Sequence, residues 1–133
     1  MDTLEELVVS GKELNRELVA SVLKPFLRID GATCTIIPDA RWQTLSNEAK
    51  VLQFLLARKA MVALDLPLEH EGATPAEIEQ ETDVKGGSIR PALKKFFDQK
   101  TLTKSNDGRY FVPNYSIERL KSLSKRWLEE ARE

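Results

Sequence analysis

Residues with reactive or metal-binding side chains are scarce in this chain of 133 residues, which contains one cysteine and one histidine. The lone Cys34 excludes a disulfide within the chain and is typical of a reducing compartment. A structural Cys/His zinc site needs four such ligands, which one chain cannot supply here. We interpret Cys34, which alternates with threonines in a predicted strand, as a packed core thiol, and His70, between two glutamates, as an exposed loop residue. Sequence distance leaves a Cys34–His70 nucleophilic pair open, although no residue near Cys34 would activate its thiol.

Motifs of nucleotide-binding sites are also missing. Gly11-Lys12 is followed by Glu13, and Glu6 stands where the phosphate-binding loop needs its first glycine. Gly86-Gly87 lacks the third glycine and the preceding strand of a dinucleotide site. A row of alternating acidic residues is interpreted as a solvated surface rather than a metal site: Glu77, Glu79, Glu81 and Asp83. We therefore predict that the protein is not an enzyme and binds no cofactor or metal.

No apolar run is long enough to cross a membrane. The most apolar stretch, Val51 to Leu66, is interrupted by one amide and three charged residues: Gln53, Arg58, Lys59 and Asp65. The chain starts with the acidic segment Met1 to Glu6, unlike the basic start of a signal peptide. We therefore expect a soluble, cytoplasmic protein without a membrane-spanning segment.

Positive charge is concentrated in one part of the sequence, although the net charge of the whole chain is only −1. Residues 1–84 carry 8 Lys or Arg against 15 Asp or Glu, whereas residues 85–110 carry 7 against 2. The basic segment is typical of a surface that faces nucleic acid, and equally of a solvated basic face. The motifs in the same segment favour the first interpretation.

Residues 74–112 show the signals of a helix, a tight turn, a second helix and a hairpin. Thr74 can cap a helix in which Pro75 takes the first position and Glu77 completes a capping box. The glycines at 86 and 87 interrupt the helical pattern. Apolar residues then recur at helical spacing: Ile89, Leu93, Phe96 and Phe97. Asn106-Asp107-Gly108 predicts a hairpin turn between strands at 102–104 and 110–112.

These segments resemble the winged helix-turn-helix proteins, particularly small prokaryotic transcription regulators, over about residues 45–113. Ala73 to Ile78 is similar to the second helix of that family. Gly86 to Phe97 is similar to its recognition helix, with the following strand at Thr101-Leu102-Thr103. Two positions depart from the family pattern: Lys85 replaces the usual Ser or Thr cap, and Pro91 lies within the helix. The helix starts near Ser88 or near Gly86, and the resemblance favours Gly86.

The predicted fold is mainly α with small β-hairpins, built as a winged helix-turn-helix core with additions at both ends. Residues 1–44 form an N-terminal helix (Thr3 to Leu23, ended by Pro25) and a hairpin that turns at Asp30-Gly31. Residues 45–115 form the winged helix-turn-helix, and residues 116–133 form a C-terminal amphipathic helix. Gly11 weakens the N-terminal helix and would allow it to split.

Two apolar surfaces need a covering partner. The helix capped by Ser46 and running to Leu64 is apolar almost all round, so it must be buried on more than one side. The N-terminal helix and hairpin, or a partner subunit, would cover it. The C-terminal stripe from Ile117 to Leu128 either folds back onto the core or pairs with its counterpart in a second copy. This stripe and the apolar stripe of the N-terminal helix are the surfaces on which we predict a homodimer to form.

The resemblance implies binding to double-stranded DNA through the 86–99 helix and the 102–112 wing, by a homodimer. Arg90 and Lys94 are the best candidates for base-edge or phosphate contacts, and the other candidates are expected near phosphates or the minor groove. The full set of candidates is Thr74, Lys85, Ser88, Arg90, Lys94, Lys95, Lys104, Asn106 and Arg109. Asp98 shares the outward face and opposes phosphate binding. The alternative function is a winged helix used as a protein-protein interaction module in a replication, transcription or secretion assembly.

Overall fold

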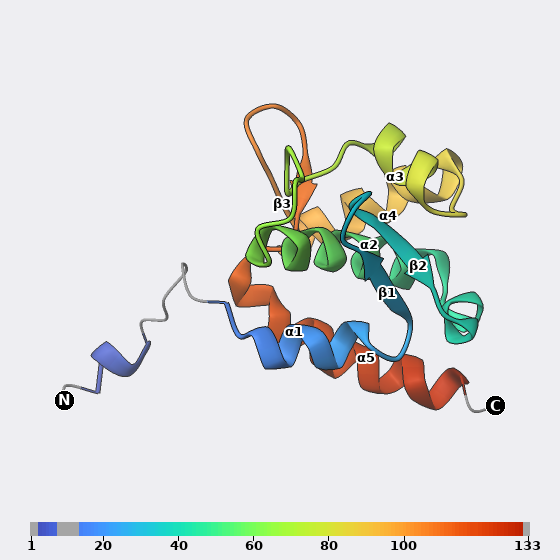
Figure 1. Ribbon diagram of the computed structural model, residues 1–133. Helices are drawn as coiled ribbons and strands as arrows, with labels where there is room; N and C mark the ends of the chain where they lie inside the picture. The colour runs from blue at the N-terminus through green and yellow to red at the C-terminus, as the bar shows by residue number, and fades with distance from the viewer. Residues whose placement is uncertain (1–2, 8–13, 132–133) are drawn as a thin grey trace.

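The computed structural model describes residues 3–7 and 14–131, and it is mainly helical with two small antiparallel hairpins (Figure 1). The helices are α1 (Arg16–Leu23), α2 (Asn47–Ala63), α3 (Pro75–Glu81), α4 (Gly86–Asp98) and α5 (Ile117–Ala131). The strands are β1 (Leu27–Asp30), β2 (Thr35–Pro38), β3 (Thr103–Lys104) and β4 (Tyr110–Phe111). Short 3-10 turns are η1 (Glu5–Leu7), η2 (Ala40–Thr44) and η3 (Asn114–Ser116).

Helix α2 lies in the middle of the molecule, with α1 and α5 on one side and α3 and α4 on the other (Figure 1). The Ser46 hydroxyl caps α2 by accepting a hydrogen bond from the Ala49 amide at 3.1 Å, as predicted. Its residues from 49 to 59 are all buried, including Lys50, Gln53 and Arg58. Helix α2 packs against α1, α4 and β4, which confirms the prediction that the N-terminal helix covers it.

The N-terminal helix is shorter than predicted. Helix α1 begins only at Arg16, because the Asn15 side chain accepts from the Leu18 amide at 3.0 Å and starts a new helix there. The prediction of an α-helix from Thr3 is therefore wrong for residues 5–7, where η1 is a separate 3-10 turn. Gly11, the predicted weak point, lies outside the described residues. The C-terminal end, just before Pro25, is confirmed.

The first hairpin turns through four residues instead of the predicted two. Asp30 pairs with Thr35, which leaves residues 31–34 as the loop. The Asp30 carboxylate accepts hydrogen bonds from two amides inside this loop, at 2.9 and 3.3 Å, and so stabilises the longer turn. Cys34 is buried as predicted, but it lies in the loop at a φ of 55° and not in a strand.

Helix α4 begins at Gly86, the earlier of the two predicted starts, and continues through Pro91. Its first turn contains a tight bond from the Ser88 amide to the Lys85 carbonyl (2.9 Å), and the Lys85 side chain makes no capping bond. After the helix ends at Asp98, Lys100 adopts a φ of 63°, and the Thr101 amide donates to the Phe96 carbonyl at 2.9 Å. This is the Schellman ending that usually places glycine where Lys100 stands.

The second hairpin, β3–β4, has the predicted turn. The Gly108 amide bonds the Ser105 carbonyl at 3.0 Å, and Gly108 adopts a φ of 82° that suits glycine. Tyr110 also pairs with Ala73 in a single antiparallel bridge, which joins the hairpin to the segment before α3. The strands are shorter than the predicted 102–104 and 110–112, but they lie within those bounds.

Helix α5 folds back and packs against α1. Trp127 is 9% exposed and meets the edge of Phe26 at a centroid distance of 6.3 Å. One hydrophobic core includes residues of all three predicted parts of the chain. The two apolar stripes expected to form a dimer surface, on α1 and α5, therefore cover each other within one chain. No helix in the described part of the chain has the length and apolar character needed to cross a membrane.

Candidate nucleic-acid interface

The outward face of α4 carries the predicted cations. Ile89, Leu93 and Phe96 are buried toward the core, while Arg90 and Lys94 are exposed on the opposite side. Phe97, which was predicted to turn inward, is instead 44% exposed. Its ring meets the edge of Tyr110 on the hairpin at a centroid distance of 6.3 Å, so it joins α4 to β4 at the surface.

The exposed cations of α4 differ in their partners. Lys94 pairs with Asp98 one turn later at 3.0 Å, and Lys95 pairs with Glu48 of α2 at 2.8 Å. Lys85 and Arg90 form no ion pair with any residue that the structure describes. Because exposed pairs contribute only about 0–1 kcal/mol, Lys94 and Lys95 remain available to a stronger anion.

Three other candidates also lie at this surface. The Ser88 hydroxyl is half-buried and accepts from the Asn47 side chain at 3.3 Å. Asn106 is exposed at the tip of the hairpin. The Lys104 ammonium is exposed and lies 5.2 Å from the centre of the Tyr110 ring. Lys104 is thus linked to α4 through the Tyr110 ring, which also meets Phe97.

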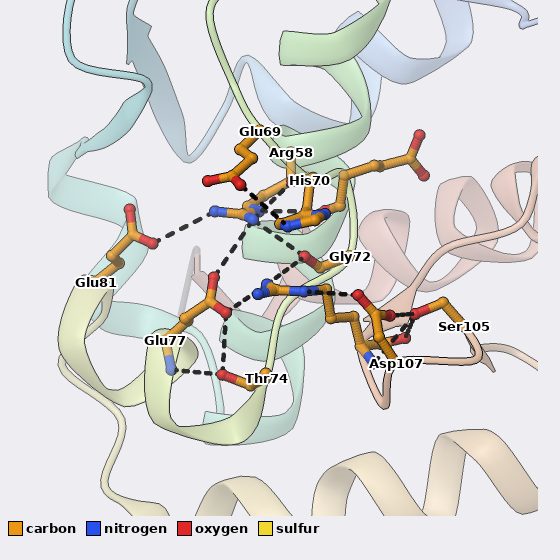
Figure 2. A network of polar contacts seen from close by, with 11 residues as sticks. Arg58, Glu69, His70, Gly72, Thr74, Glu77, Glu81, Ser105 and Asp107 are labelled. Carbon is orange, nitrogen blue, oxygen red and sulfur yellow. Dashed lines mark hydrogen bonds and ion pairs between the residues drawn. The ribbon is translucent and has the colours of Figure 1, made fainter.

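Thr74 and Arg109, in contrast, are half-buried and bound to groups within the protein, and Figure 2 shows Thr74 beside Glu77. The Thr74 hydroxyl accepts from the Glu77 amide at 3.2 Å and donates to the Glu77 carboxylate at 3.1 Å. The Arg109 guanidinium bonds the same carboxylate and also that of Asp107, and its side chain is only 21% exposed. A phosphate expected at the N-terminus of α3 would meet the Glu77 carboxylate there, and the expected outward reach of Arg109 is not seen.

The centre of this internal network is Arg58, which sequence reasoning missed. Its guanidinium donates to the three backbone carbonyls of residues 70–72 at 2.7 to 3.1 Å. It also lies 3.5 Å from a Glu77 oxygen and 3.4 Å from a Glu81 oxygen. Arg58 is 4% exposed. The network thus links α2, the loop before α3, α3 itself and the β3–β4 hairpin.

The two glutamates of the network have opposite pKa shifts. Burial opposes ionisation of Glu77, but hydrogen bonds from Arg109 and Thr74 and the charges of Arg109 and Arg58 outweigh it and lower its pKa. Burial raises the pKa of Glu81, because the charge of Arg58 offsets it only in part and Glu77 adds repulsion. Glu77 is therefore the principal anion that holds the two arginines.

A second cluster fixes the turn between α3 and α4. The Asp83 carboxylate accepts from the Trp42 indole at 3.1 Å and from Lys50 at 2.9 Å. Burial opposes ionisation of Asp83, yet these bonds and the Lys50 charge lower its pKa. In the acidic row interpreted as solvated surface, Glu77 and Glu81 are half-buried beside Arg58, whereas Asp83 keeps 43% of its side chain exposed while it pairs with Lys50. Within the described ranges, no group of three His, Cys, Asp or Glu side chains is placed to hold a metal.

A pocket of about 570 Å³ lies between the C-terminal end of α2, the loop before α3 and the β3–β4 hairpin. Its charged lining is already paired: Lys59 lies 3.0 Å from Glu71, and Arg109 is bound as described. His70 also lines this pocket and lies 3.7 Å from Glu69. Cys34 is not among its lining residues, so this pocket does not bring Cys34 and His70 together.

No protein-family model, curated protein or solved structure matches this chain. The candidate interface therefore stands on the geometry of α4 and the β3–β4 hairpin alone.

Proposed function

We propose that the protein is a winged helix-turn-helix protein that binds duplex DNA through α4 and the β3–β4 hairpin, as a transcription regulator. The observation that carries this proposal is the exposed position of Arg90 and Lys94 on α4, away from its buried face, with the exposed Lys85 immediately before the helix. Lys104 on the hairpin adds positive charge beside it. Basic residues gathered on one helix and its neighbouring hairpin are typical of surfaces that bind nucleic acid.

In this proposal, α4 enters the major groove. Arg90 reads a base edge, because a guanidinium can donate two parallel hydrogen bonds to guanine. Lys85, Lys94 and Lys95 contact phosphates, and Lys104 and Asn106 follow the backbone from the hairpin. The internal network around Arg58 then has a positioning role, since it holds the hairpin against α3 while the exposed residues bind.

The test compares Arg90→Ala with Arg126→Ala in gel-shift titrations at two salt concentrations. Both arginines are exposed on helices, but Arg126 belongs to α5. We expect Arg90→Ala to weaken specific binding by about 5- to 150-fold, the equivalent of about 1–3 kcal/mol, and to relax sequence preference. Arg126→Ala should bind as the wild type does. Equal affinities in all three proteins would refute the role of α4.

A protein-interaction module is the second candidate, and the exposed apolar pair of Pro91 and Phe97 favours it. Acidic residues also lie close to the basic face, with Asp98 and Glu48 each bound to one of its lysines. The two functions differ in salt dependence: DNA binding through about five phosphates weakens steeply as salt rises, whereas an apolar protein interface does not.

The predicted homodimer and cytoplasmic location belong to this proposal. A two-fold pair would double the DNA contacts and match a palindromic site. Such a pair needs a surface other than the α1 and α5 stripes, which cover each other in one chain. Sedimentation at micromolar concentration distinguishes a dimer from a 15.1 kDa monomer.

A further inference from the structure

An apolar groove of about 350 Å³ lies between α1, β1 and the C-terminal end of α2, apart from the candidate interface. Aliphatic side chains form its floor: Val19, Ala20, Leu23, Leu27, Ala63 and Leu64. Leu64, at one edge, is 52% exposed. A groove lined in this way favours an occupant with aliphatic side chains.

The rim of the groove carries positive charge without a carboxylate. Arg16, Lys24 and Arg28 line it, and the described residues that line the groove include no Asp or Glu. The Arg28 guanidinium is held by the backbone carbonyls of Lys24 and Leu27, and Arg16 lies 3.5 Å from the Ala63 carbonyl. An occupant that complements this rim is acidic as well as aliphatic.

The chain's own N-terminal segment has this character. From Asp2 to Leu7 the sequence contains three acidic residues and no basic one. In η1 the Leu7 amide bonds the Leu4 carbonyl at 3.2 Å, and side chains three residues apart in a 3-10 turn lie on the same side. Leu7 is 76% exposed and Leu4 is 68% exposed. The segment therefore presents an aliphatic ridge that the structure leaves in contact with solvent.

Connectivity favours docking within one chain. Leu14 itself lines the groove, and only residues 8–13 separate it from Leu7. A tether of this length reaches at most about 25 Å. Such a short tether gives an effective concentration in the millimolar range, well above the micromolar concentration of a second copy.

We propose that the groove is a docking site for residues 3–7 of the same chain, with Leu4 and Leu7 on its aliphatic floor and the acidic side of the segment at its basic rim. The structure shows the undocked arrangement, in which η1 stands away from α1 (Figure 1). Docking would cover the exposed edge at Leu64. A partner that enters the groove has to displace this segment and must offer the same acidic and aliphatic pattern.

The experiment compares amide spectra of the full chain as wild type, Leu7→Ser and Thr3→Ser. Thr3 is exposed in the same segment and serves as the matched control. We expect Leu7→Ser to shift the amide signals of Val19, Leu23 and Ala63, and Thr3→Ser to leave them in place, at every protein concentration. Unmoved groove signals in Leu7→Ser, or equal movement in both variants, would overturn the proposal. Groove signals that change with concentration while the sedimenting mass doubles would also overturn it, because they assign the docked segment to a second copy.

Discussion

Replacing Arg58 by methionine tests whether the internal network holds the hairpin to α3. Methionine keeps an unbranched apolar side chain beside Phe54, whose ring centre lies 5.7 Å from the guanidinium carbon. The change leaves three backbone carbonyls of residues 70–72 and two carboxylates without their common donor. Breaking a buried ionic network by removing one partner costs about 3–5 kcal/mol. This is a large part of the total stability of about 5–15 kcal/mol expected for such a domain.

Urea unfolding followed by far-ultraviolet circular dichroism measures this loss, and thermal unfolding should show a fall in Tm of roughly 10–20 °C. Arg41→Met is the matched control, because Arg41 is exposed in η2 and forms no ion pair within the described ranges. Its effect should stay within about 0.5 kcal/mol. Arg58→Lys keeps the charge without the planar fork and should fall between the two. If the free energy of unfolding of Arg58→Met fell by less than about 1 kcal/mol, the reasoning would be refuted, since water would then satisfy the carbonyls and carboxylates that the guanidinium binds.

For three further substitutions, the structure determines whether stability rises or falls. Lys100→Gly should raise the free energy of unfolding by about 1 kcal/mol in a urea titration, because it relieves a left-handed conformation; a decrease would contradict the Schellman ending. Gly72→Ala should lower the melting temperature, because an added Cβ would lie 2.8 Å from the Arg109 Cβ and 3.2 Å from the Tyr110 carbonyl oxygen; an unchanged value would show that the loop moves freely. Glu77→Gln should be less stable than the wild type at neutral pH. Because the pKa of Glu77 is lowered in the folded protein, the ionised Glu77 adds to the free energy of unfolding at pH values above the usual glutamate pKa of about 4.3. This stabilisation is lost as pH falls through the folded pKa. The free energies of unfolding of the two proteins should therefore converge in acid.

Local chemistry made several elements predictable from the sequence. Ser46 and Thr74 start α2 and α3 because each hydroxyl accepts from an amide three residues later. Gly108 supplies the positive φ that the hairpin turn needs. The turn of the first hairpin was predicted wrongly because Asp30-Gly31 also suits a longer loop, in which the Asp30 carboxylate accepts hydrogen bonds from the amides of residues 32 and 33. The winged helix-turn-helix identity remains a prediction.

The direction of charged side chains was less predictable than the elements that carry them. Arg109 lies 32 residues from Glu77, and nothing in its local sequence shows that it turns inward. One signal was present for Arg58. A cation within a helix that is apolar all round has to be buried, and a buried cation needs carbonyl or carboxylate partners. Two of these partners, Glu77 and Glu81, are acidic residues of α3.

The burial of α2 on every side has a consequence for how this sequence can vary. A helix at a protein surface normally has one side on which substitutions accumulate without loss of stability. Helix α2 lacks such a side from residue 49 to 59, so each position there is restricted in size or by an ion-pair partner. Helices α4 and α5 each keep an exposed row and can diverge on it. Among relatives of this chain, α2 should therefore change most slowly, while the exposed rows of α4 and α5 should vary more.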